Sequence, residues 1–161
     1  MSYENIREQI AAVLGSVDGA GVVHQYTRWA ADRKKFLSLF QDPDGKINGW
    51  MITRERVPQR KVTQGEKERA HIFILRKIYG LTDDEASELS FQQHLEAVQN
   101  AFNLHETLNG SCESIVPDWG PLAGSAGLQI EGAGEVRMFG GVLCHYAECR
   151  LQASERIEDN F

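Results

Sequence analysis

Histidines are the residues of this chain that could most readily bind a metal or move a proton near neutral pH. His71 and His145 lie in stretches with the composition of β-strands, so strand pairing could bring the two imidazoles together. Two histidines and a carboxylate would form a minimal metal site, and one hypothesis is therefore a small His-dependent metal hydrolase. No HxH or HExxH spacing supplies a third ligand. The favoured prediction is that these histidines are structural and that the protein uses no metal and no cofactor.

Three further segments have the residue types of known sites without their spacing. Segment 42–45, Asp-Pro-Asp-Gly, suggests a calcium loop, but the first and twelfth loop positions would fall on Phe40 and Met51, so a type I turn is the better interpretation. Segment 123–127, AGSAG, approximates a nucleophile elbow but lacks a strand before it and a helix after it. The glycines of segment 15–21 match neither GxGxxG nor a P-loop. We therefore predict no catalytic residues and no enzymatic activity.

The bulk composition and the cysteines limit the class of protein. Cys112, Cys144 and Cys149 are odd in number and lack CxxC spacing, which is typical of reduced, buried thiols. A chain of 161 residues with 42% hydrophobic and 25% charged residues is typical of one globular domain. No apolar run approaches the roughly 20 residues that cross a bilayer, and the N-terminal segment does not match a secretory signal. These features predict a single cytosolic domain over residues 1–161 without membrane contact.

Positive charge is concentrated in one part of an acidic chain. Residues 1–77 contain 14 Lys/Arg and 9 Asp/Glu, a net charge of +5, whereas residues 78–161 contain 3 and 14, a net charge of −11. A DNA-binding patch, a solvated hairpin tip and a subunit contact are three interpretations of the basic cluster. Interruption by Glu55, Glu66 and Glu68 and the lack of a base-stacking platform favour the subunit contact over DNA. The cluster contains Arg54, Arg56, Arg60, Lys61, Lys67, Arg69, Arg76 and Lys77.

The hypothesis for this contact is that the basic cluster of one copy meets the acidic half of the next. Long-range attraction orients such an encounter more than it supplies affinity, so apolar side chains must also meet. The predicted interface comprises Arg56, Arg60, Lys61, Lys67 and Arg69, with Trp50, Met51 and Trp119 as the apolar contacts.

The element order predicts an α+β domain with a mixed, mainly antiparallel sheet, helices on one face and a long protruding β-hairpin. Strands 47–57 and 69–79 should pair as that hairpin, joined by an unusually long connection of about eleven residues. Thr82 and Glu85 fit a capping box at the start of a helix. The glycine-rich segment 109–135 is expected to be mobile or ordered by a partner. The predicted elements are helices at 3–14, 30–40 and 82–103 and strands at 22–26, 47–57, 69–79, 128–131 and 142–154.

Three segments carry a resemblance to a known family: VHQYTRWAADRKKFLSLF (Val23–Phe40), INGWMITRERVPQRKV (Ile47–Val62) and MFGGVLCHYAECRLQA (Met138–Ala153). Together with the helix between them, they resemble the neck proteins of long-tailed bacteriophages, in particular the tail terminator family. The resemblance implies a structural virion protein, made in the bacterial cytoplasm, that forms a ring, commonly a hexamer. It also implies contacts with the tail tube protein and the head-to-tail connector, and DNA passing through the lumen without specific binding. The alternative within this class is a head completion or adaptor protein.

Overall fold

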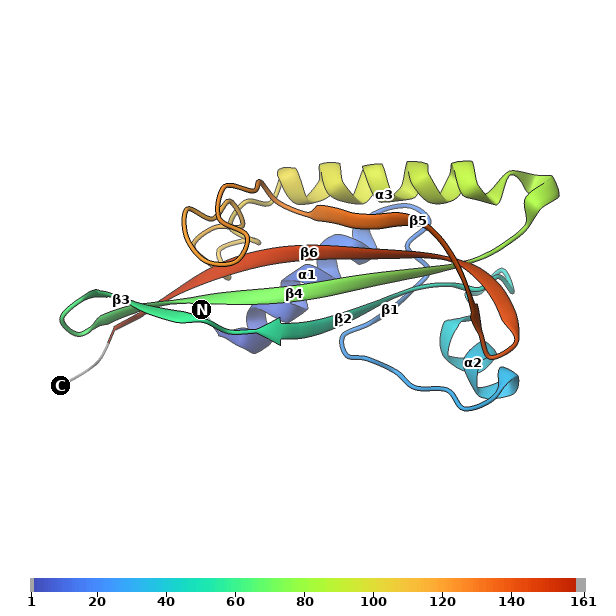
Figure 1. The fold of residues 1–161 in the computed structure, drawn as a ribbon, viewed down its shortest axis with the longest axis horizontal. Coiled ribbons are helices and arrows are strands. Elements are labelled where there is room, and N and C mark those ends of the chain that lie inside the picture. The colour runs from blue at the N-terminus through green and yellow to red at the C-terminus, as the bar shows by residue number, and fades with distance from the viewer. Residues whose placement is uncertain (1, 159–161) are drawn as a thin grey trace.

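A six-stranded, mostly antiparallel sheet runs along the length of the molecule (Figure 1). The computed structural model describes residues 2–158. The helices are α1 (Tyr3–Ser16), α2 (Arg33–Phe40), the 3-10 helix η1 (Asp83–Glu85) and α3 (Ser87–Asn103). The strands are β1 (Val22–His24), β2 (Asn48–Arg56), β3 (Gln59–Thr63), β4 (Glu66–Gly80), β5 (Gln129–Phe139) and β6 (Val142–Glu158).

The strand order is β1-β2-β4-β6-β5, and β3 pairs with β4 alongside β2. Only β1 and β2 run parallel; every other pair is antiparallel. The long central strands β4 and β6 pair from Glu66 opposite Glu158 to Gly80 opposite Cys144. The predicted α+β class and mainly antiparallel sheet are confirmed.

The main core lies between one face of the sheet and the helices α1 and α3. Alternate residues of the strands point to this face because side chains of a strand alternate between its two sides. Ser2 caps α1 by accepting a hydrogen bond from the amide of Asn5, as its sequence suggests. The buried side chains of this core include Ile6, Ile10, Trp50, Ile52, Phe73, Leu75, Phe91, Leu95, Val98, Phe102, Ala147, Cys149 and Leu151.

The helix α2 packs on the opposite face of the sheet, so helices lie on both faces rather than on one. Its buried Phe36 and Phe40 contact a second, smaller cluster. The sheet residues Met51, Ile78 and Tyr146 reach this cluster because each is one position out of phase with the main core. This second face is covered by only two helical turns, which leaves part of it open.

The segment between β2 and β4 is a strand and a tight turn, not the predicted long loop. β3 pairs with the first residues of β4, from Gln59 opposite Arg69 to Thr63 opposite Glu66. Only Gln64 and Gly65 remain as the turn, and Gly65 takes a φ of 83° that favours glycine. The protruding hairpin is therefore confirmed. The predicted length of its connection is wrong, because the polar residues expected to form a loop form the solvent-exposed strand β3.

Two other local predictions are wrong. The predicted capping box does not form, because α3 begins only at Ser87, after the 3-10 turn and a left-handed Ala86. The amide of Thr82 instead donates to the hydroxyl of Ser87. The segment expected to be mobile packs against the main core through Cys112, Ile115 and Leu128, and its last residues belong to β5.

Candidate functional site

The two histidines considered for a metal site lie on neighbouring strands, His71 on β4 and His145 on β6, but far apart along them. His145 stands opposite Tyr79 and His71 stands opposite Ala153, eight residues apart along β4. At about 3.3 Å per residue the separation is roughly 26 Å, far beyond the reach of a shared ion. Within residues 2–158 no group of three or more His, Cys, Asp or Glu side chains could hold a metal. The hydrolase hypothesis based on this pair is therefore wrong.

Each of these histidines has a buried partner of its own. His71 Nε2 lies 2.6 Å from Glu155 Oε2, while its Nδ1 lies 3.4 Å from a guanidinium nitrogen of Arg54. Because Arg54 can only donate, Nδ1 accepts and Nε2–H donates to the carboxylate, which describes a neutral imidazole. Burial lowers the pKa of His71 in agreement with this tautomer, although the hydrogen bond to Glu155 acts against the shift. His145 hydrogen-bonds the Ser87 hydroxyl at 2.8 Å. Both histidines serve the fold.

The most prominent feature of the hairpin region is a three-stranded ribbon that projects beyond the core, at the left of Figure 1. We call it the strand extension, and it comprises β3, residues 64–69 and residues 156–158. Every residue of β3 is exposed, and β3 pairs with β4 alone. On the other side, β5 stops pairing with β6 at Arg150, and among the described residues the next backbone pairing on that edge is a single bridge from Ser114 to Ser154. The ribbon therefore has two open edges.

The charges of the strand extension are paired largely within the subunit. Arg60 lies 3.1 Å from Glu68, and Arg156 lies 3.2 Å from Glu66. Further along the sheet Arg150 lies 3.1 Å from Glu55, a residue of β2. These pairs arise because β4 lies directly between β2 or β3 and the acidic strand β6. The inference that the two halves of the sequence form separate charged flanks is therefore wrong, since they interleave in one sheet.

Trp119 belongs to this intramolecular network and anchors the base of the extension. Its indole N–H donates to Glu68 at 2.7 Å, and the Arg60 guanidinium stacks over its ring at 4.6 Å from the centroid. Asp118 adds a weaker contact to Arg60 at 3.8 Å. The predicted interface residues Trp119 and Arg60 thus bind each other, leaving the outer surface of the indole half-exposed.

The remaining predicted interface residues fall into two groups. Trp50 is 0% exposed in the main core and Met51 is buried in the cluster under α2, so neither can serve as an exposed anchor. Their strand is central in the sheet, which the sequence alone did not reveal. Arg56 and Lys61 are exposed, and Arg69 is exposed with its guanidinium bonded to Gln59 at 2.8 Å. Lys67 is half-buried beside them on the extension.

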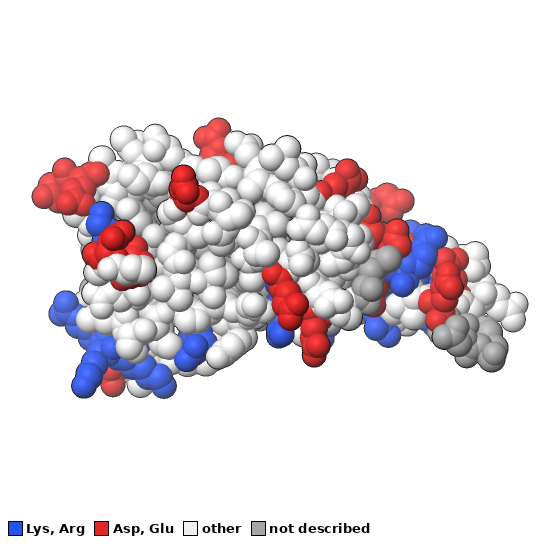
Figure 2. Space-filling view, turned by 180° about the vertical axis from the view of Figure 1, so that it is seen from behind, with Lys and Arg blue, Asp and Glu red and all other residues white. Residues whose placement is uncertain are grey.

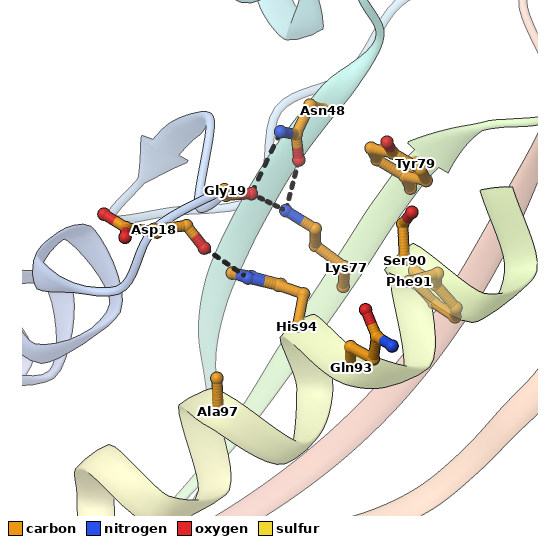
Figure 3. Close-up of a pocket in the computed structure, with 10 residues that line it drawn as sticks. All are labelled: Asp18, Gly19, Asn48, Lys77, Tyr79, Ser90, Phe91, Gln93, His94 and Ala97. Carbon is orange, nitrogen blue, oxygen red and sulfur yellow. Dashed lines mark hydrogen bonds between the residues drawn. The ribbon is translucent and has the colours of Figure 1, made fainter. Parts of the chain in front are cut away.

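A pocket of about 300 Å³ between the loop after α1, β4 and α3 is lined by Lys77 and His94 (Figure 3). The sequence placed Lys77 in the basic cluster at the predicted subunit contact, but its side chain is buried and cannot take part in one. Lys77 is buried, and its ammonium donates to the carbonyls of Ala20 at 3.0 Å and Gly19 at 3.3 Å and to the side-chain oxygen of Asn48. His94 accepts a hydrogen bond from the Trp50 indole at 3.1 Å and donates to the Asp18 carbonyl at 3.0 Å.

Burial controls the protonation of both groups. It lowers the pKa of Lys77 to about 7, with the carboxylate of Asp42 acting weakly in the opposite direction. Burial and the neighbouring Lys77 lower the pKa of His94 to about 4, so this imidazole is neutral at pH 7. A lysine with such a pKa in a cleft is a candidate nucleophile or base.

The hydrogen bonds of Lys77 argue for a structural clamp. All three N–H donors of an ammonium have acceptors here, and two of those acceptors are backbone carbonyls of the loop. The loop comes so close to β2 that a Cβ on Gly21 would lie 2.2 Å from the Asn48 carbonyl oxygen. Lys77 therefore fixes the loop after α1 to the sheet. A single lysine in a run of apolar strand residues was the only signal in the sequence.

The three cysteines are buried free thiols. Burial raises the pKa of Cys112, Cys144 and Cys149 to about 12, so none is a nucleophile at neutral pH. Between residues 2 and 158 no helix is long and apolar enough to cross a membrane.

No protein-family model matches the chain, and no curated protein matches it in sequence.

Proposed function

We propose that the protein is a structural component of the neck of a long-tailed bacteriophage, a tail terminator whose copies form a ring on the last tier of the tail tube. The ring stops growth of the tube and presents a surface to the head connector. The observation that carries this proposal is the strand extension, a ribbon with two open edges that projects from an otherwise well-packed domain.

An open-edged ribbon is a surface made for pairing with another chain. Unpaired strand edges promote association, and proteins that remain alone usually shorten, twist or cover them. Here β3 has apolar Val62 beside Lys61 on an exposed strand, and residues 156–158 leave the other edge free within the described part of the chain. Strand addition supplies main-chain hydrogen bonds to the partner, while side chains of the ribbon select it.

The position of the extension suits a ring. It lies at one end of an elongated protomer, and in the proposed ring the neighbour receives it on a different patch, which makes the contact heterologous. Heterologous contacts produce rings when the rotation closes. The net charge of −6 disfavours tight binding of phosphate, as a channel for DNA in transit requires.

Reversing the exposed charge of the ribbon tests the proposal. The variant K61E/V62D changes two exposed residues that take part in no buried cluster, so the fold should persist. Particles assembled with it should carry tail tubes of uncontrolled length or tails without heads, counted by electron microscopy. The matched control is E96K, a charge reversal at an exposed glutamate in the middle of α3, which lies outside the strand extension and should leave the particles normal.

The same images separate the terminator from the head completion role. Loss of a terminator lengthens the tubes, whereas loss of a head completion protein leaves tubes of normal length beside unjoined heads. Normal particles with K61E/V62D in every copy would count against any role of the extension in the neck.

A further inference from the structure

A groove lies on the open part of the second sheet face, between the loop after β1, α2 and the turn from β5 to β6. We call it the basic groove; its volume is about 640 Å³. Its floor is the sheet itself, and two large side chains at its rim stand in solvent, Trp29 with 81% and Met138 with 67% of their surface exposed. The lining includes Trp29, Phe36, Met51, Ile78, Met138 and Tyr146. Apolar surface of this kind marks a binding site.

The rim of the groove is positively charged. Arg28, Arg76 and Arg137 line it, and no acidic residue does. Arg76 and Arg137 have carboxylate neighbours, Glu148 at 3.5 Å and Glu135 at 2.7 Å. The adjoining first turn of α2, Arg33-Lys34-Lys35, is exposed, and its three side chains make no ion pair with any residue between 2 and 158. The occupant of this groove should therefore combine apolar and acidic side chains.

The chain presents that combination on the other face of its own sheet. Asp83, Asp84 and Glu85 of η1 and Glu88 at the start of α3 are all exposed, with no cation among them. Leu89 follows directly and has 64% of its surface in solvent. We call residues 83–89 the acidic corner. Of its carboxylates Glu85 alone approaches a cation in the described structure, Lys46 at 3.9 Å between two exposed side chains.

The two surfaces lie at the same end of the molecule but cannot meet within one copy. α3 packs on one face of the sheet and α2 on the opposite face. Figure 1 shows the start of α3 at the upper right and α2 at the lower right. Figure 2, seen from behind, shows acidic groups at the upper corner of that end and basic groups along its lower corner. A second copy, displaced perpendicular to the sheet, can place its acidic corner against the basic groove of the first copy.

We propose that the basic groove receives the acidic corner of a second copy, with Leu89 of one subunit packing against Trp29 of the next. The contact joins two different patches and is therefore heterologous, as the subunit contact of a closed ring must be. It rests on the proposed function and specifies which sides of neighbouring subunits meet. It also places the strongest exposed positive charge between subunits rather than in the channel.

Cross-linking between copies tests the contact directly. In the variant L89C/W29C a short bismaleimide should join each copy to the next and give a ladder of covalent oligomers on a denaturing gel. The native cysteines are buried with their pKa raised to about 12 and should not react. The matched control is L104C/W29C, because Leu104 is 83% exposed at the far end of α3 and should give no ladder.

Charge exchange provides an independent test. The variants D83K/D84K and R33E/K34E should each weaken self-association by about tenfold or more, because the first removes the net negative charge of the acidic corner and the second removes the net positive charge of the first turn of α2. Their combination in one chain sets lysines at positions 83 and 84 against glutamates at positions 33 and 34 of the next copy, and association should return to within about threefold of the original. All four positions are exposed, and glutamates in the first turn of α2 favour its helix dipole, so folding should be retained.

The outcomes separate this contact from the proposed function. A ladder with L89C/W29C alone, and rescue by the fourfold variant, support the contact. Oligomers seen by light scattering without either result overturn it and leave the neck proposal intact. A chain that stays monomeric at every concentration and gives no ladder also overturns it. Normal particles with K61E/V62D would instead remove the extension from the neck proposal, whatever the cross-linking shows.

Discussion

The two faces of the sheet contrast sharply in how they are covered. The face under α1 and α3 is closed, with Trp50, Phe73 and Leu75 excluded from solvent. The other face has only the two-turn helix α2 and leaves the basic groove open beside it. The closed face gives the domain its stability, and the open face and the strand extension are left to contact other chains. Substitutions should therefore affect folding on one side and assembly on the other.

The largest effect is expected for Phe73→Ala on the closed face. Phe73 is fully buried and stacks on Tyr3 of α1, so truncation leaves a cavity and should lower the free energy of unfolding by about 3–5 kcal/mol. Urea denaturation followed by circular dichroism measures this loss. A cost below about 1 kcal/mol would mean that the closed face does not carry the stability.

The next effect concerns the clamp in the pocket beside that face. Lys77→Met leaves the carbonyls of Gly19 and Ala20 without their donor and should cost about 1–3 kcal/mol at pH 7. Between pH 7 and 10.5 the unfolded chain holds a proton on Lys77 that the folded chain releases, so this group makes stability rise with pH. Lys77→Met should remove that rise. An unchanged pH dependence, or reductive methylation of Lys77 in the folded protein, would contradict the structural clamp.

A smaller effect should appear in acid. The pKa of His94 is lowered to about 4, so the unfolded chain binds a proton below pH 6.5 that the folded chain refuses until about pH 4. The contribution of His94 to the free energy of unfolding is complete above pH 6.5 and is lost as the pH falls from 6.5 to about 4. The loss is on the order of 2 kcal/mol after allowing for the partial exposure of the imidazole. His94→Gln should flatten the fall relative to the original protein. Parallel curves for the two proteins would show that His94 does not titrate as described.

The smallest effect on folding is expected for Trp29→Ala on the open face. Its indole is 81% exposed, so the free energy of unfolding should change by less than about 0.5 kcal/mol. Self-association measured by sedimentation should nevertheless weaken. Loss of stability similar to that of Phe73→Ala would erase the contrast between the two faces.

The sequence predicted the regular elements well where periodicity was strong. The helix from Tyr3 and the strands around Trp50, Phe73 and Cys149 all appear close to their expected positions. Failures came where local signals compete with tertiary contacts. The Thr82–Glu85 pattern fits a helix cap, yet a 3-10 turn precedes α3. The hydroxyl of Ser87 at the start of α3 accepts the hydrogen bond from the amide of Thr82.

The site was harder to predict than the fold because it depends on which strands are neighbours. Charge counted along the chain suggested separate flanks, but β4 between β3 and β6 places Glu68 beside Arg60 and Arg156 opposite it. Trp50 looked available for an interface until its central strand became known. The basic groove combines residues of the loop after β1, of α2 and of strands β2, β4, β5 and β6, and has no signature in any one segment.

The central claim is that copies of this protomer close into a ring at the junction of a phage head and tail. Electron cryomicroscopy of assembled particles at a resolution that resolves helices tests it most directly. We predict a ring at the top of the tail tube in which each strand extension contacts another chain. Particles that lack the protein, or a ring in which every extension projects into solvent, would contradict the account.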